Sequence, residues 1–154
     1  MALANDANYT EAGSAVLSFK LTDAVVAYRG SLMGINLSTG FAVLWSDATD
    51  YNVAFLGLAM RRSTGDATPD AGKDRPEVEV DCSGVVLKKL SVTGASTQTQ
   101  VGDRVFSADD NSYSLSATTG GRPVGFVTRL YNAGAAICDV QLLTPAEFRA
   151  LVGS

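Results

Sequence analysis

The sequence predicts an all-β protein: a compact β-sandwich or barrel-like domain of about ten short strands, with one short helix at its C-terminal end. Three observations indicate this class. Short apolar or alternating runs recur along the 154 residues, separated by clusters of Gly, Asp, Asn, Ser and Thr. A convincing helical pattern occurs only near the C-terminus. The length suits one domain with a sizeable core.

Each predicted strand is an apolar or alternating run that ends at turn-forming residues. In YRGSLMGINLSTG, residues 31–37 are extended and 38–40 form a hairpin turn, with Gly40 at positive φ. Gly34 is expected at a bulge or beside a close backbone. No helix follows, so these glycines do not build a phosphate-binding loop. The predicted strands are 15–21, 24–28, 31–37, 41–45, 53–60, 77–82, 85–90, 104–108, 113–116, 124–131 and 135–142.

Two parts of the chain resemble each other weakly. VAFLGLAMRR followed by EVEVDCSG is similar to PVGFVTRLYN followed by AAICDVQ. Each is an apolar strand containing Gly57 or Gly125 and then an alternating strand containing Cys82 or Cys138. The similarity predicts two related β lobes or sheets around one core.

The predicted helix begins after Thr144, because Pro145 suits the first helical position and Glu147 completes a capping box. Phe148, Leu151 and Val152 then share one face. A helix of about nine residues does not persist alone in water, so it must dock on the rest of the protein or on a neighbour.

Two segments carry no strand or helix pattern. Residues 1–14 are polar and small, which predicts a flexible N-terminal arm before a single domain at 15–154; the arm either orders on binding or is only a frayed terminus. Residues 61–76 are rich in Gly, Pro, Asp and Thr, which predicts a long mobile loop. This loop holds four of the twelve basic residues and is either a contact segment or a solvent-exposed connection without a contact role.

Composition restricts the partners. The net charge of −4 and a pI near 4.7 argue against nucleic acid and anionic membranes, so the expected partner is protein. Hydrophobic residues make up 46% and charged residues 18%, which indicates an interface between copies. The N-terminus has no signal-peptide or anchor pattern, so synthesis in the cytoplasm is expected. In that compartment Cys82 and Cys138 are predicted to be buried, unpaired thiols.

Catalytic chemistry is not evident in the sequence. It contains no His, which removes the commonest general base and most zinc sites. Glu77, Glu79 and Asp81 share one face of a predicted strand, but their alternation with apolar residues indicates an ordinary wet face. We therefore expect no enzyme activity, no catalytic residue, no metal and no cofactor.

One enzyme family remains an alternative. Tyr28-Arg29-Gly30 and Gly102-Asp103-Arg104 are similar to short motifs of the trimeric dUTPases, which are all-β nucleotide hydrolases. The acid that precedes the first motif in that family is replaced here by Val25, Val26 and Ala27. The Ser-rich phosphate motif and the Gly-rich C-terminal arm of that family are also absent.

Taken in order, YRGSLMGINLSTG, FLGLA, VGDRVFSADDN and PVGFVTRLYNAGAAICDVQL resemble the head decoration proteins of tailed bacteriophages, also called capsid cement proteins. The resemblance covers residues 24–142. It implies a small β-rich virion protein, often a homotrimer, on the outer surface of the expanded head, where it clamps neighbouring copies of the major capsid protein. Another virion β-module, such as a head-fibre base or a tail component, remains a further alternative.

A clamp of this kind needs apolar area for its own trimer and polar loops or extendable segments for the shell. The arm, the first strand and the 61–76 loop supply such groups. The candidate contacts with the capsid or between subunits are Tyr9, Val16, Phe19, Arg61, Arg62, Lys73 and Arg75.

Overall fold

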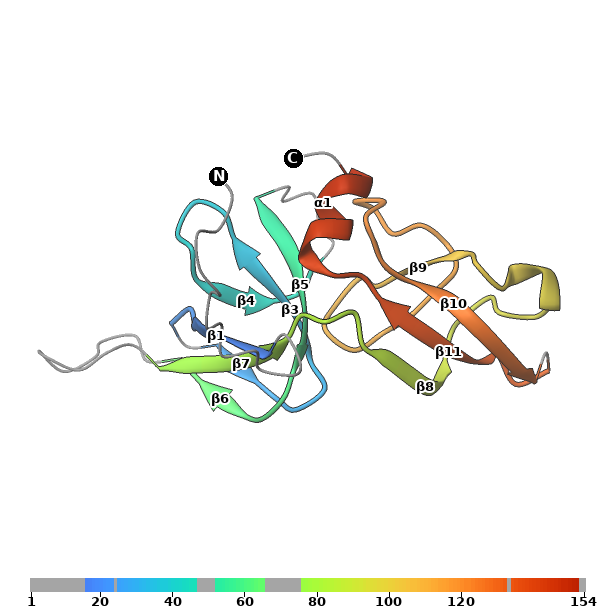
Figure 1. Ribbon diagram of the computed structural model, residues 1–154, viewed down its shortest axis with the longest axis horizontal. Coiled ribbons are helices and arrows are strands. Elements are labelled where there is room, and N and C mark those ends of the chain that lie inside the picture. Colours follow the sequence, from blue (N-terminus) through green and yellow to red (C-terminus); the bar gives the residue numbers. More distant parts are fainter. Residues whose placement is uncertain (1–15, 24, 47–51, 66–75, 133, 153–154) are drawn as a thin grey trace, which may run out of the picture.

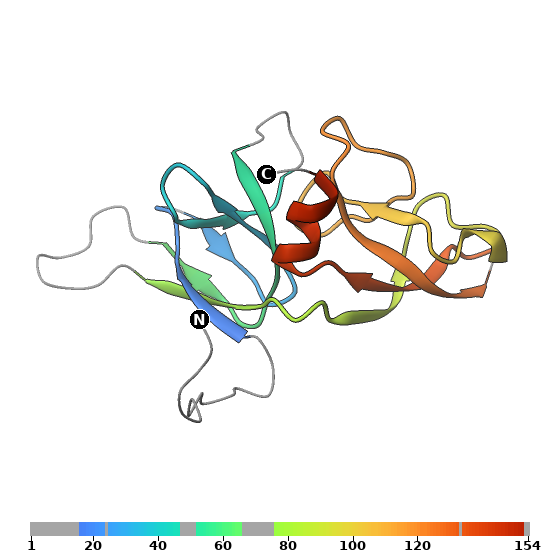
Figure 2. The ribbon, with the colours of Figure 1, turned by 45° about the horizontal axis from the view of Figure 1, so that its top comes forward.

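The computed structural model describes residues 16–23, 25–46, 52–65, 76–132 and 134–152. These residues form eleven β-strands, one short 3-10 helix and one α-helix, which confirms the predicted all-β class. The arm predicted at 1–14 lies outside the described residues. Figures 1 and 2 show a five-stranded sheet and a four-stranded sheet side by side along the longest axis, with the helix α1 over their junction.

The first sheet has the strand order β1-β7-β5-β3-β4, and all neighbouring strands are antiparallel. A parallel bridge between Leu21 and Ala42 joins the two outermost strands at one end, so the sheet curls on itself. The five strands are β1 (Val16–Lys20), β3 (Leu32–Asn36), β4 (Ala42–Leu44), β5 (Val53–Ala59) and β7 (Glu77–Asp81).

The second sheet has the order β8-β11-β10-β9, again antiparallel throughout. Its strands are β8 (Val86–Ser91), β9 (Arg104–Phe106), β10 (Pro123–Asn132) and β11 (Ile137–Leu142). Residues 113–116, predicted as a full strand, pair only through bridges from Ser114 to Thr93 and Phe106. That prediction was wrong because the Ser116 N–H turns back to the Ser114 side chain, at 3.1 Å, and ends the extended run.

A third, two-stranded sheet pairs β2 (Val26–Ala27) with β6 (Ser63–Thr64). The prediction of a continuous loop over 61–76 is therefore wrong in its first part. Gly65 extends the pairing by donating its N–H to the Val25 carbonyl at 2.7 Å. A two-residue strand is too short to produce a recognisable period in the sequence. Residues 66–75 of that segment lie outside the described part of the chain.

The hairpin between β3 and β4 confirms both roles predicted for its glycines. Gly40 has φ +73°, and its N–H donates to the Asn36 carbonyl at 2.7 Å. The Asn36 side chain also accepts the N–H groups of Ser38 and Thr39. A register shift falls between Met33 and Gly34, and a Cβ at Gly34 would lie 2.6 Å from a Val53 methyl group. A side chain there would collide with β5.

One large apolar cluster joins both sheets and the helix. Its centre is an aromatic triad: the Trp45 ring lies edge-to-face with Phe55 at 5.5 Å and with Phe148 at 5.6 Å between centroids. Val105, Val124 and other residues of the second sheet pack into the same cluster. A smaller cluster fills the inside of the first sheet around Leu21, Met33, Val78 and Val80. The two sheets therefore share the larger cluster, while the smaller one lies within the first sheet, and the segments of the internal similarity form the antiparallel pairs β5–β7 and β10–β11.

The helix α1 (Pro145–Val152) lies where the sequence predicts it. The Glu147 N–H donates to the Thr144 hydroxyl at 3.2 Å, which is the predicted cap. Phe148 is buried and Val152 packs against the core, but Leu151 is 47% exposed. The three residues predicted to share one face all line one pocket, and Leu151 is the most exposed of them.

Candidate protein-interaction surface

The outer strand β1 presents apolar side chains at the edge of the first sheet. Phe19 is half-buried against the smaller core cluster and pairs in register with Val78. Val16 is half-buried and pairs with Asp81. Leu17, on the same strand face as Phe19, is 51% exposed. β1 therefore has partly covered apolar side chains on both sides: Leu17 and Phe19 on the side of Val78 and Val80, and Val16 on the side of Glu79 and Asp81.

Arg61 lies beside this edge because of an ion pair with β7. Its Nη2 is 2.6 Å from Oε1 of Glu79, and Glu79 pairs in register with Ser18 of β1. The two side chains are 67% and 37% exposed. An ion pair this exposed contributes about 0–1 kcal/mol, so either partner can exchange it for an outside charge at little cost.

Arg62, the next residue, lies over an aromatic ring. Its guanidinium carbon is 5.5 Å from the centroid of Tyr28, which is itself exposed. The β2–β6 pair holds the two segments together, since Ala27 pairs with Ser63. Arg62 and Tyr28 therefore form an exposed cation–π pair beside the arginine–glutamate pair.

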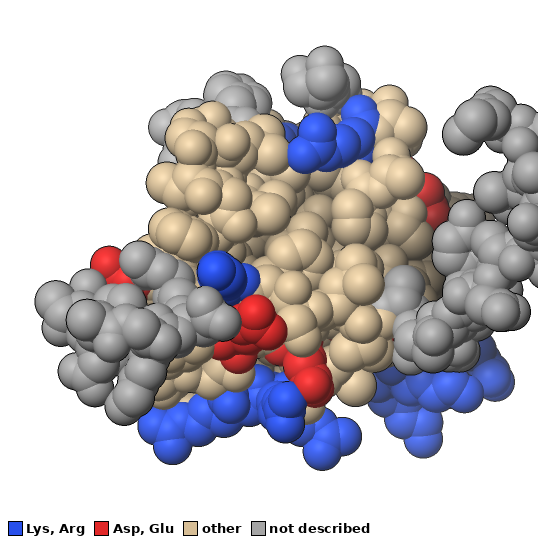
Figure 3. Space-filling model, turned by 60° about the vertical axis from the view of Figure 1, so that its left-hand side comes forward, with Lys and Arg blue, Asp and Glu red and all other residues tan. Residues whose placement is uncertain are grey.

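The structure thus places four of the seven predicted contact residues around the edge strand β1 and its neighbour β7, Val16 and Arg61 on the side of Glu79 and Phe19 on the opposite side, with Arg62 next to Arg61 over Tyr28. Figure 3 shows the end of the molecule that carries the first sheet, where a broad surface without charged side chains lies between groups of basic side chains and beside an acidic group. Tyr9, Lys73 and Arg75 lie outside the described residues. We call the surroundings of the edge strand β1, on both sides of the sheet, the β1–β7 face and define it by Val16, Leu17, Phe19, Tyr28, Arg61, Arg62 and Glu79.

Sequence reasoning missed three members of this face as contact residues. Leu17 lies in the same apolar run as Val16 and Phe19, and no local pattern shows that it is the most exposed of the three. Tyr28 was singled out only as part of the tripeptide that resembles a dUTPase motif. Glu79 was correctly placed on a wet strand face, but its pairing with Arg61 depends on a fold contact that no local pattern shows.

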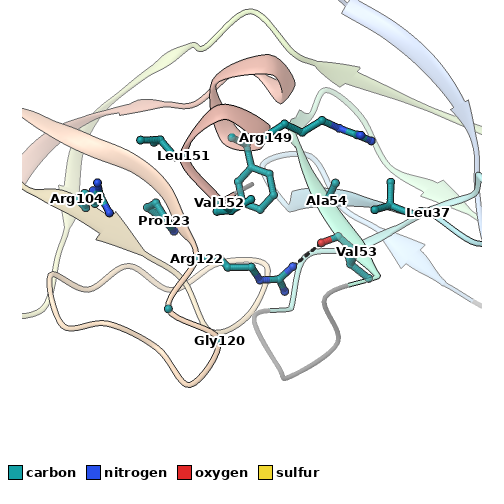
Figure 4. Close-up of a pocket in the computed structure, with 12 residues that line it drawn as sticks. Leu37, Val53, Ala54, Arg104, Gly120, Arg122, Pro123, Arg149, Leu151 and Val152 are labelled. Carbon is teal, nitrogen blue, oxygen red and sulfur yellow. Dashed lines mark hydrogen bonds between the residues drawn. The ribbon is translucent and has the colours of Figure 1, made fainter. Parts of the chain in front are cut away.

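A pocket of about 400 Å³ lies at the junction of the two sheets, under α1. Figure 4 shows it between β5, the chain before β10, and the helix. Arg122, only 4% exposed, donates from Nη1 to the Val53 carbonyl at 2.6 Å and lies 5.0 Å from the Trp45 ring. The described lining residues are Leu37, Val53, Ala54, Arg104, Gly120, Gly121, Arg122, Pro123, Phe148, Arg149, Leu151 and Val152.

Asp139 is the one buried carboxylate among the described residues. Burial alone would raise its pKa, but the Lys89 N–H and the Tyr131 hydroxyl, each 2.9 Å from a carboxylate oxygen, hold the pKa below its usual value. Both neighbouring strands change register opposite it, and Lys89 has φ +54°. Asp139 therefore lies where β8 and β10 both change register against β11, and hydrogen bonds stabilise its negative charge there.

Burial raises the pKa of other titratable side chains among the described residues. Burial, and then Asp81, raises the pKa of the Cys82 thiol to about 11, and the two cysteines are buried and unpaired as predicted. Burial, then Asp110 and Asp109, raises the pKa of Tyr113 to about 12. In the described part of the chain, no three His, Cys, Asp or Glu side chains are grouped to hold a metal ion. No helix there is long and apolar enough to cross a membrane.

The two motifs shared with dUTPases lie in different surroundings. Tyr28 is paired with Arg62 at the β1–β7 face, whereas Arg104 lines the pocket. Neither Tyr28 nor Arg29 is a lining residue of that pocket.

Comparison of the chain with protein-family models, curated proteins and solved structures gives no match.

Proposed function

We propose that this chain is a head decoration protein of a tailed bacteriophage. It binds the outer surface of the expanded head, contacts neighbouring copies of the major capsid protein and stabilises the shell. It acts as a homotrimer and by binding alone, without catalysis. The sequence resemblance over residues 24–142 supports this function.

The observation that carries the proposal is the β1–β7 face. At the edge strand β1, Leu17 and Phe19 lie on one side of the sheet, and Arg61, some forty residues later, lies on the other side through its pair with Glu79, the register partner of Ser18. Exposed apolar side chains beside exposed arginines and an aromatic ring are the composition that protein interfaces favour. The curled sheet beneath them supplies a rigid support.

Stabilisation of a shell follows from mass action. A ligand that binds only the assembled, expanded shell raises the free energy needed to open it, by an amount that grows with ligand concentration over Kd. Bridging several coat subunits extends this effect, because opening then requires release of a contact on each. The Arg61–Glu79 pair can open at little cost and re-form with coat side chains.

The test is co-sedimentation with expanded heads assembled without the protein. Wild-type chain is expected to bind at micromolar concentration or below. Arg61→Glu reverses a charge on the β1–β7 face and should weaken binding about tenfold or more. Leu17→Ser removes an exposed apolar group and should weaken binding by a similar factor, with little effect on folding.

The matched control is Lys88→Glu, a charge reversal on an exposed residue of β8 in the other sheet. It should bind like wild type. If Lys88→Glu and Arg61→Glu weakened binding to the heads equally, the β1–β7 face would not be the contact surface. Absence of wild-type binding would reject the function. Sedimentation equilibrium of the free chain should give a trimer mass. Microscopy that places the chain on the tail or on a fibre base would reject the head location.

A further inference from the structure

The pocket under α1 joins an apolar interior to an apolar rim. Val53 and Ala54 of β5 and Phe148 of α1 form buried parts of its lining. Leu37 and Leu151 also line it, and they are 46% and 47% exposed. They lie at opposite ends of the view in Figure 4, so a segment that crosses the pocket mouth would cover both, at about 25 cal/mol per Å² of apolar area buried.

The charged side chains that line the same pocket are all positive. Three arginines line it, Arg104, Arg122 and Arg149, and its described lining includes no Asp or Glu. Arg122 is fixed in the wall by Val53 and Trp45. Arg104 and Arg149 are exposed. A concave apolar site with cationic side chains at its border selects a ligand that is apolar in the middle and anionic at one end.

Figure 4 shows where the two exposed arginines lie relative to the rim leucines. The Arg149 side chain extends from α1 toward the side where Leu37 and Ala54 lie, whereas Arg104 lies at the opposite end. An apolar side chain inserted beside Leu37 therefore has the Arg149 guanidinium as its neighbouring cation. Guanidinium groups bind carboxylates through two parallel N–H donors, which favours a carboxylate close to the inserted side chain.

We infer that this pocket binds a peptide segment of a partner protein in which an apolar side chain lies next to a carboxylate. A small metabolite confined to the interior would leave both rim leucines wet, whereas a peptide crossing the mouth covers them. This inference rests on the proposed function, because it gives the chemistry of one coat-protein segment that the decoration protein would hold. It adds a second contact, distinct from the β1–β7 face.

The experiment uses the free chain and three short probes. Acetyl-Gly-Gly-Leu carries the side chain and a terminal carboxylate, its carboxamide lacks the charge, and acetyl-Gly-Gly-Gly lacks the side chain. Trp45 is the chain's single tryptophan and contacts both Arg122 and Phe148, so its fluorescence reports binding. The first probe should bind about tenfold more tightly than the carboxamide, and the triglycine should not bind measurably.

Variants assign the site. Arg149→Gln should abolish the preference for acid over amide while leaving amide binding unchanged, and Arg149→Lys should restore part of the preference. Leu151→Ser should weaken both leucine probes. Arg29→Gln, a change at an exposed arginine outside the pocket, should behave as wild type. Equal binding of acid and amide by wild type, no binding at millimolar probe, or loss of the preference in Arg29→Gln would overturn the inference.

The two proposals can fail separately. Shell binding that persists while the wild-type chain ignores the peptide probes would reject the pocket assignment alone. Peptide binding with the predicted preference, but no binding to expanded heads, would reject the decoration function and leave the pocket as a peptide site for another partner.

Discussion

Removing the Phe148 side chain tests how the helix and the two sheets are held together. Phe148 is buried and lies edge-to-face with Trp45 at 5.6 Å and tilted against Phe55 at 6.1 Å between ring centroids. Burying such a side chain contributes about 1.5–3 kcal/mol. Each favourable aromatic pair adds about 0.5–1.5 kcal/mol. Phe148→Ala also leaves a cavity, so we expect a loss of about 3–5 kcal/mol in the free energy of unfolding.

The assay is urea unfolding followed by circular dichroism and by Trp45 fluorescence. Phe148→Leu keeps much of the volume and should lose clearly less than Phe148→Ala. Ala150→Ser, at an exposed position of the same helix, should lose about 0.5 kcal/mol or less. A loss below about 1 kcal/mol for Phe148→Ala, with an unchanged m-value, would refute the role of the triad as the centre of the core.

Three further predictions concern other parts of the chain. The pKa of Asp139 is lower in the folded chain than the ordinary carboxyl value of about 3.9. Its ionised form therefore stabilises the fold fully above that value, and this contribution is lost as the pH falls through the folded pKa. The difference in Tm between wild type and Asp139→Asn should therefore narrow below about pH 4. A gap that stays constant down to pH 2 would contradict this. Gly57→Ala would drive a Cβ into the Asp81 carbonyl and should cost about 2 kcal/mol or more in urea unfolding; a neutral variant would contradict the β5–β7 packing. Burial raises the pKa of both thiols, so Cys82 and Cys138 should react with a disulfide reagent only after denaturation, and rapid reaction of the native chain would show that they are accessible.

Local patterns in the sequence determine most of the strands and the helix. Alternation in EVEVD identifies β7 because Val78 and Val80 are fully buried between wet acidic residues. The helix start follows from Thr144 and Pro145, whose chemistry acts within one turn. Gly40 is predictable for the same reason, since a turn of three residues fixes its positive φ.

What the sequence does not reveal depends on contacts between distant segments. The strand β6 exists because Ser63 and Thr64 meet β2, and neither residue has a period of its own. The 3-10 turn Gln98–Gln100 is held by the Gln100 side chain, which accepts the N–H groups of Ser96 and Thr97. Thr97 and Gln100 fit the capping-box pattern of a helix start, but no apolar helical period follows them in the sequence.

For the candidate site, too, the residue types could be predicted from the sequence and their spatial assembly could not. The residue types of the β1–β7 face were predictable, because exposed arginines and an apolar first strand are visible in the sequence. Its assembly was not, since it requires the β1–β7 register and the Arg61–Glu79 pair. The pocket was missed entirely, because Leu37, Arg122 and Arg149 are brought together only when α1 docks at the junction of the sheets.

The most direct test of the decoration function is the thermal disruption of expanded heads, measured by light scattering at increasing occupancy by the chain. We expect the disruption temperature to rise with occupancy and to level off when the binding sites are filled, with Arg61→Glu requiring a higher concentration for the same rise. Heads that carry a full complement of the chain yet disrupt at the same temperature as bare heads would contradict it.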